Sequence, residues 1–125
     1  MADVQKQLQA LSEDYQNLQK ELDTTVSASE KLDSQKTENL SVQKEFKTLA
    51  EDANIYKLVG PVLLKQDKSE ATMAVDGRLE YIEGEIKRVE KQIQDIQEKS
   101  EKKKVEIIAI QTQAQQQQQQ QQAAA

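Results

Sequence analysis

Glu80, Glu83 and Glu90 are the side chains whose type and spacing come closest to a catalytic or metal-binding group. Carboxylates three or seven residues apart share one face of a helix, but acid–base chemistry also requires burial or a nearby charge that shifts a pKa. In a chain that is 31% charged, these three residues fit a solvated helix face better. We therefore expect no metal site and no catalytic carboxylate pair.

Other common catalytic groups are missing from the sequence. It contains no histidine and no cysteine, which removes the usual zinc ligands and the Cys–His and Ser–His–Asp arrangements. It has three glycines and no G-x-x-x-x-G-K-[ST] segment that could hold a nucleotide phosphate. We expect a protein that is not an enzyme and that uses no cofactor.

Charge and hydropathy limit the partners. The net charge is −5, and the lysine-rich residues 99–104 are interrupted by Glu101 without interleaved aromatic side chains, which argues against nucleic acid. No apolar run approaches the roughly 20 residues that span a bilayer, and no signal-peptide pattern opens the chain. We expect a cytoplasmic protein with no nucleic-acid or membrane partner.

Residues 54–66 are the densest apolar, β-branched run in the chain, and they contain its one proline. Gly60-Pro61 marks a turn, and Pro61 has no N–H to give to a strand ladder. The run therefore predicts a β-hairpin with strands Ile55–Val59 and Val62–Gln66, in which Gly60 takes backbone angles that a side chain would disfavour.

The predicted hairpin is apolar on both faces. We expect one face to carry Tyr56, Leu58, Val62 and Leu64, and the other Ile55, Val59 and Leu63. A lone hairpin is marginal in water, and the sequence predicts no further strands to cover it, so partner hairpins from other chains are the simplest cover. The predicted subunit interface is Ile55, Tyr56, Leu58, Val59, Gly60, Pro61, Val62, Leu63 and Leu64.

Residues 1–53 have the heptad pattern of a coiled-coil helix. Its apolar seam runs through Val4, Leu8, Leu11, Tyr15, Leu18, Leu22 and Thr25. The seam turns polar near residues 33–39 and resumes at Val42 and Phe46. Counting through Thr25, Ala28, Leu32 and Gln35 therefore requires an extra step of three residues. That irregularity predicts either a bent segment or a harmless solvated position.

Residues 67–114 predict a second coiled-coil helix, capped by Asp67 or Ser69. Its seam is Val75, Leu79, Ile82, Ile86, Val89, Ile93, Ile96, Ser100, Lys103, Ile107 and Ile110. Gly77 and Gly84 lie off this seam, either as tolerated surface glycines or because another chain approaches closely. Residues 115–125 are a low-complexity Gln/Ala tail that either extends the helix or frays, and to which we assign no function.

The expected fold is dominated by α-helix: a long antiparallel two-helix coiled coil joined by one β-hairpin. Its far end should bring together more apolar side chains than a two-helix seam can enclose. The candidate residues there for binding another polypeptide are Val4, Leu8, Leu11, Val105, Ile107, Ile108 and Ile110. The alternative is that they simply continue the seam.

Three stretches of the sequence resemble a known family. Asn-Ile-Tyr-Lys-Leu-Val-Gly-Pro-Val-Leu-Leu-Lys-Gln at residues 54–66 is similar to the hairpin signature of β-type prefoldin subunits. Arg-Leu-Glu-Tyr-Ile at residues 78–82 and Glu-Ile-Lys-Arg at residues 85–88 resemble the helix that follows that hairpin. The specific similarity covers residues 54–90, whereas the outer helices agree in length and heptad pattern.

The resemblance implies a heterohexamer of α-type and β-type prefoldin subunits whose hairpins pool into a β-barrel platform. It also implies capture of unfolded or nascent polypeptides, such as actin and tubulin, and their delivery to the cytosolic chaperonin without ATP. The residues alone leave an alternative open, namely a structural coiled-coil scaffold or tether that binds one specific partner.

Overall fold

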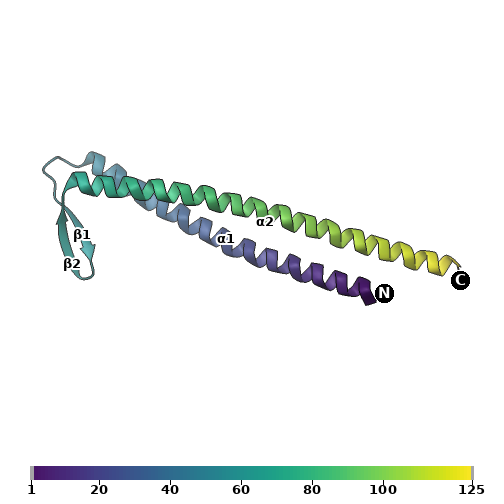
Figure 1. The fold of residues 1–125 in the computed structure, drawn as a ribbon. Coiled ribbons are helices and arrows are strands. Elements are labelled where there is room, and N and C mark those ends of the chain that lie inside the picture. The colour runs from purple at the N-terminus through teal and green to yellow at the C-terminus, as the bar shows by residue number, and fades with distance from the viewer. Residues whose placement is uncertain (1, 125) are drawn as a thin grey trace. The chain divides into compact units, whose positions relative to one another are not determined.

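The computed structural model describes residues 2–124, and its elements follow in the order helix, strand, strand, helix (Figure 1). Helix α1 is Ala2–Thr48, strand β1 is Ile55–Val59, strand β2 is Val62–Gln66 and helix α2 is Lys68–Ala124. Two long helices joined by a single hairpin confirm the expected fold class.

The chain divides into two structural units, and each contains a part of both helices. The first unit contains the residues up to Ser27 and those from Glu90 onward, and the second is Ala28–Val89, which includes the hairpin. In the first, Asp14 contacts Lys103 and Gln19 contacts Ser100. In the second, Gln43 contacts Asp76 and the Leu49 carbonyl contacts Lys68. Within each unit the paired helix segments therefore run antiparallel.

Helix α1 ends at Thr48 rather than near Ala53, which corrects the expected end of the first helix. A tight turn follows, in which the Ala53 N–H donates to the Ala50 carbonyl at 3.0 Å. The side chain of Lys68 donates to the Leu49 carbonyl at 3.1 Å and satisfies one of the acceptors that a helix end leaves free. The chain is thereby redirected into β1 before the apolar pattern ends.

The seam of α1 keeps one heptad register, which corrects the expected extra step near residues 33–39. Beyond Thr25 the half-buried positions continue at Ser29, Leu32, Lys36, Asn39, Gln43 and Phe46. Val42 and Leu40 are exposed instead. Apolar side chains alone would shift the seam, whereas helix geometry turns polar side chains inward at these positions. There Gln43 Nε2 donates to Asp76 Oδ1 at 2.7 Å.

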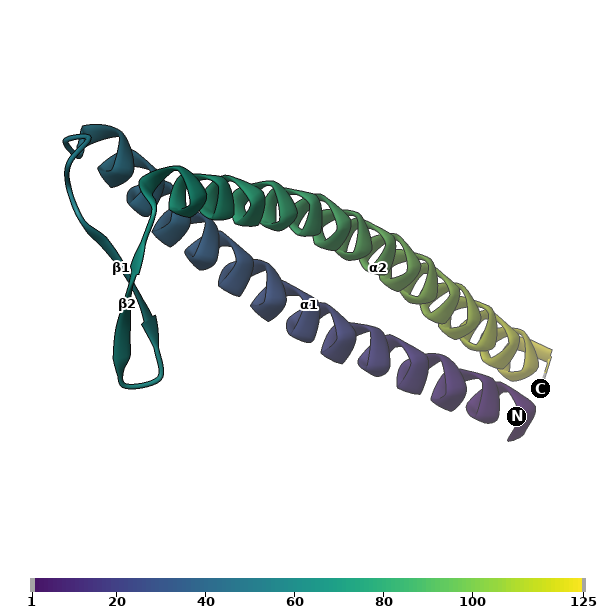
Figure 2. The same cartoon turned by 60° about the vertical axis from the view of Figure 1, so that its left-hand side comes forward.

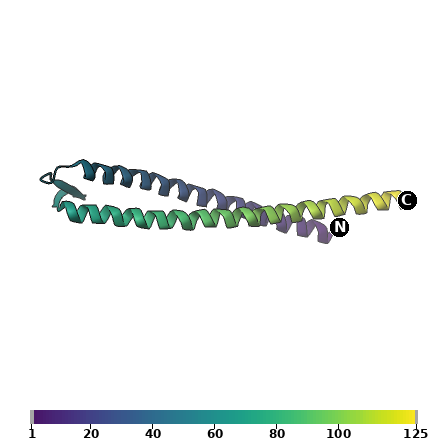
Figure 3. The same cartoon turned by 90° about the horizontal axis from the view of Figure 1, so that it is seen from above.

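Helix α2 follows its predicted pattern closely. It begins after Asp67, whose carbonyl accepts the Ala71 N–H at 2.9 Å, and Glu70 lies in its first turn. Every predicted seam residue is buried or half-buried, and Val89, at 3% exposure, is the most enclosed apolar side chain. Residues 115–124 continue the helix with exposed side chains, and Figures 1 and 3 show these turns passing the N-terminal end of α1.

The two strands pair antiparallel across the two-residue loop Gly60-Pro61. Gly60 has a φ of 59°, in the left-handed region that favours glycine, as expected. Val59 pairs with Val62 and Lys57 with Leu64, and residues directly opposite each other share a face. One face therefore carries Ile55, Lys57, Val59, Val62, Leu64 and Gln66, and the other Tyr56, Leu58, Leu63 and Lys65.

This pairing corrects the expected faces. The expected grouping put Val62 and Leu64 with Tyr56 and Leu58, but a two-residue loop keeps Val59 and Val62 on the same side. Both faces still carry apolar side chains, so the reason for expecting a cover remains.

Candidate binding surfaces

The hairpin is the most exposed apolar element of the second unit. Leu58 is 68% exposed and Leu63 63%, and Tyr56, Val59, Val62 and Leu64 are also exposed. Only the base is enclosed, where Ile55 is 9% exposed in a hollow lined by Phe46 and Val75. Figure 2 shows the twisted ribbon of β1 and β2 standing clear of the helix segments of its own unit.

Both outer edges of the hairpin are unpaired, since β1 and β2 form the only sheet among residues 2–124. Alternate residues of an antiparallel strand direct N–H and C=O groups away from the partner strand. An edge of this kind is a template on which another strand can pair. Exposed apolar faces and open edges together give the hairpin the chemistry of a strand-pairing surface.

The predicted client-binding residues all lie in the first unit, and they form two sets. Val4, Leu8, Leu11, Ile107 and Ile110 are half-buried seam positions. Val105 and Ile108 lie outside the seam and are 57% and 51% exposed. Because Val105 and Ile108 are three residues apart on α2, they share one exposed face.

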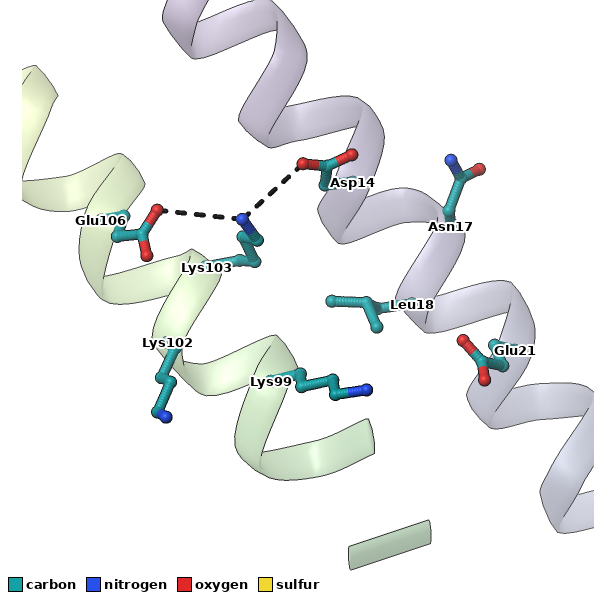
Figure 4. A pocket seen from close by; sticks show the side chains of 8 residues that line it. All are labelled: Asp14, Asn17, Leu18, Glu21, Lys99, Lys102, Lys103 and Glu106. Atoms are coloured by element: carbon teal, nitrogen blue, oxygen red, sulfur yellow. Dashed lines mark ion pairs between the residues drawn. The ribbon is translucent and has the colours of Figure 1, made fainter. Parts of the chain in front are cut away.

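The seam of the first unit is polar next to these residues. Ser100 is 6% exposed, and its Oγ accepts a hydrogen bond from Gln19 Nε2 at 2.7 Å. Lys103 Nζ lies 3.7 Å from Asp14 Oδ2 and 4.0 Å from Glu106 Oε2. Figure 4 shows Lys103 reaching between these carboxylates, with Leu18 pointing toward α2 across a hollow of about 410 Å³. Apolar contact is thus interrupted where Ser100 and Lys103 occupy the seam.

Glu80, Glu83 and Glu90 are exposed, as the solvated-face interpretation predicts. Within residues 2–124 no cluster of three or more His, Cys, Asp or Glu side chains could hold a metal ion. The hydrogen bond from Arg88 lowers the pKa of Glu85, with a smaller contribution from the charge of Arg88, and the two side chains form an exposed ion pair of 2.7 Å. Among the described residues neither helix is both long and apolar enough to cross a membrane.

Two long helices joined through a short antiparallel hairpin define the class of protein, a helical chaperone subunit of the prefoldin type. Residues 9–125 match the prefoldin subunit family, and the chain belongs to this family. The chain is accordingly a component of a prefoldin chaperone complex, in which it assembles with other prefoldin subunits. Prefoldin subunits are chaperone components and not enzymes.

Its relatives point to one branch of the family. The chain is 43% identical to prefoldin subunit 6 of Homo sapiens over 108 residues, which cover 86% of this chain and 84% of the human protein. It is 50% identical to prefoldin subunit 6 of Saccharomyces cerevisiae over 96 residues, or 77% of this chain and 84% of the yeast protein. These matches confirm the resemblance to prefoldin seen at residues 54–66. Within the family, the matched relatives are eukaryotic prefoldin subunit 6, and the Gly-Pro-Val-Leu version of the hairpin in this chain also resembles that subunit.

Two solved structures have the same fold as this chain. The prefoldin beta subunit from Thermococcus strain KS-1 matches with a TM-score of 0.76 and 26% identity, covering 82% of this chain and 90% of that one. The prefoldin beta2 subunit of the same strain matches with a TM-score of 0.64 and 21% identity, covering 73% of this chain and 97% of that one. The second match concerns the fold alone.

Proposed function

We propose that this chain is a β-type subunit of a heterohexameric, ATP-independent chaperone that works in the cytoplasm. In this proposal it captures unfolded or nascent polypeptides, such as actin and tubulin, and helps deliver them to the cytosolic chaperonin. The observation that supports it most is the exposed hairpin, whose apolar residues other than Ile55 stay exposed within residues 2–124. Membership of the prefoldin family supplies the partners that would cover it.

The hairpin is the assembly element in this proposal. Neighbouring subunits would pair their strands with the open edges of β1 and β2 and close a β-barrel platform, in which main-chain hydrogen bonds contribute affinity and buried side chains contribute specificity. Burying one side chain such as Leu58 or Leu63 is worth about 1.5–3 kcal/mol. Burial of several such residues on one hairpin contributes favourably to assembly, against the entropy that association costs.

The client surface is formed in the first unit by the exposed Val105 and Ile108 together with the half-buried Val4, Leu8, Leu11, Ile107 and Ile110. A few partly buried apolar side chains bind an unfolded polypeptide weakly. Several subunits on one platform raise the overall affinity through effective concentration, without new kinds of contact. Weak individual contacts also allow transfer of the client to a chaperonin.

Assembly is tested by Leu58→Asp, with Leu40→Asp as the matched control, because both leucines are exposed and only Leu58 lies on the hairpin. Each variant is co-expressed with the other prefoldin subunits, and the mass of the complex is measured by native mass spectrometry. Leu58→Asp is expected to leave free helical subunits, and Leu40→Asp to assemble normally. An intact complex with Leu58→Asp would count against the hairpin as the assembly element.

Client capture is tested on assembled complexes by the suppression of aggregation of chemically denatured actin. Changing Val105, Ile108 and Ile110 to Ser together is expected to weaken suppression several-fold while assembly persists, with Leu40→Ser as the control. Undiminished capture would mean that clients bind to a different surface of the complex. If the unaltered complex holds no unrelated denatured protein in solution, the scaffold or tether alternative is favoured instead.

A further inference from the structure

Met73 and Tyr81 are large apolar side chains that lie outside the seam of α2. They are 71% and 70% exposed, higher fractions than those of the hairpin leucines. Gly77 lies midway between them at a spacing of four residues, so the three residues share one helix face. A Cβ added at Gly77 would meet no atom within 4 Å, so nothing within the chain requires a glycine there.

A hollow of about 420 Å³ opens beside this face in the second unit. Its lining is Gln35 and Asn39 from α1 and Gly77, Arg78, Tyr81 and Ile82 from α2. Ile82 is 6% exposed and belongs to the core, whereas the other residues carry amide, guanidinium and hydroxyl groups or no side chain. The exposed Met73 and Tyr81 together with these polar groups make a surface of the mixed apolar and polar kind found at protein interfaces.

This surface continues to the hairpin. Arg78 lines the hollow beside Tyr81 and also the hollow at the base of the hairpin, where Tyr56 and Lys57 lie. Arg78 thus borders both hollows, so a chain seated on β1 that continued along α2 would next meet the hollow beside Tyr81. The occupant that this continuity favours is the neighbouring subunit that, in the proposed assembly, pairs with the hairpin.

Charge indicates the chemistry of the occupant. Arg88 is neutralised by Glu85 at 2.7 Å, but Arg78 has no carboxylate within 4.0 Å among the described residues. An exposed guanidinium beside an apolar hollow is suited to a carboxylate flanked by apolar side chains. Arg78 would supply such a partner with orientation as well as attraction.

We propose that Met73, Gly77, Arg78 and Tyr81, here named the Tyr81 surface, form a second subunit contact on α2. It receives an apolar segment with an acidic side chain from the prefoldin subunit whose strand pairs with the hairpin. This inference rests on the proposed role of the hairpin in assembly. It adds that the interface extends from the strands onto the helix.

The first experiment compares two substitutions at one position. Gly77→Ala and Gly77→Gln both favour the helix, and the Cβ of either meets no atom within 4 Å in the free subunit, but only the glutamine is long enough to extend into the hollow. The complex is reconstituted from purified subunits, and its half-assembly concentration is measured by native mass spectrometry. We expect a tenfold or larger increase for Gly77→Gln and a change within twofold for Gly77→Ala. Tyr81→Ala and Arg78→Glu should also raise this concentration.

The second experiment identifies the occupant. A photoreactive phenylalanine analogue at Tyr81 is expected to cross-link to another prefoldin subunit in the assembled complex, and the same analogue at the exposed Gln97 is not. A cross-link from Tyr81 to bound denatured actin only, or to nothing, would overturn the proposal.

Leu58→Asp separates this inference from the one on which it rests. If Leu58→Asp abolishes assembly while Gly77→Gln, Tyr81→Ala and Arg78→Glu assemble like the unaltered chain, the hairpin interface holds and the Tyr81 surface is not part of it. If Leu58→Asp assembles normally, the hairpin proposal fails, whatever the variants of the Tyr81 surface do.

Discussion

Gln19 donates a hydrogen bond of 2.7 Å from its Nε2 to the Oγ of Ser100, across the two helix segments of the first unit. Ser100 is 6% exposed and occupies a seam position where an apolar residue would normally pack. A shifted alignment of the two helix segments would remove Gln19 as the partner of the buried Ser100. The pair therefore favours the alignment in which these turns of α1 and α2 face each other.

The pair can be measured with a double-mutant cycle. Gln19→Ala, Ser100→Ala and the double variant should show a coupling energy of about 0.5–1.5 kcal/mol in urea unfolding, because one net hydrogen bond is lost in each single variant. Ser100→Ile should instead raise the free energy of unfolding, since an apolar side chain suits the site. A coupling energy near zero would mean that the hydrogen bond does not persist in solution.

Gly60→Ala should destabilise the hairpin by about 1–2 kcal/mol, because a residue with a Cβ is strained at the φ of 59°. A Cβ there would meet no atom within 4 Å, so the penalty comes from the backbone alone. The matched control is Gly84→Ala, which lies within α2 and should stabilise the helix by about 1 kcal/mol. Assembly of the complex reports the effect of Gly60→Ala, and thermal unfolding followed by circular dichroism reports the effect of Gly84→Ala. The prediction requires weaker assembly for the first variant and a more stable helix for the second.

Lys36→Leu and Gln35→Leu compare two neighbouring residues of α1. Lys36 is half-buried in the continuous seam and Gln35 is exposed. Lys36→Leu should raise the free energy of unfolding by about 1 kcal/mol, and Gln35→Leu should change it by less than about 0.5 kcal/mol. A larger gain from Gln35→Leu would favour the register with an extra step of three residues.

The ion pair of Glu85 and Arg88 predicts a pH dependence of defined sign. The hydrogen bond from Arg88 lowers the pKa of Glu85 in the folded chain. The stabilisation is therefore present above the unfolded-state pKa of about 4.3, and is lost as the pH falls through the lower folded-state pKa. Arg88→Ala should raise the pKa of Glu85 in an NMR titration, whereas Arg78→Ala should leave it unchanged. An unchanged value in Arg88→Ala would exclude the pair in solution.

Several features could be predicted from local patterns. The strands follow from a β-branched run around Gly60-Pro61, and the seam of α2 from apolar residues such as Leu79, Ile82 and Ile96 at heptad spacing. The exposure of Val105 and Ile108 follows in the same way, because both residues lie between the heptad positions of the α2 seam. The exposure of Tyr81 could also have been predicted, since it precedes a seam residue on α2.

The sequence by itself determined the kinds of elements, their order and the hairpin as the element in need of a cover, because turn chemistry and hydrophobic spacing act over a few residues. Only the tertiary structure decided which polar side chains face inward along α1, as Lys36, Asn39 and Gln43 do in place of Val42. It also decided which residues share a face of the hairpin, and that Gln19 meets Ser100. These outcomes depend on how one segment is placed against another, and a local pattern of residue types does not contain that placement.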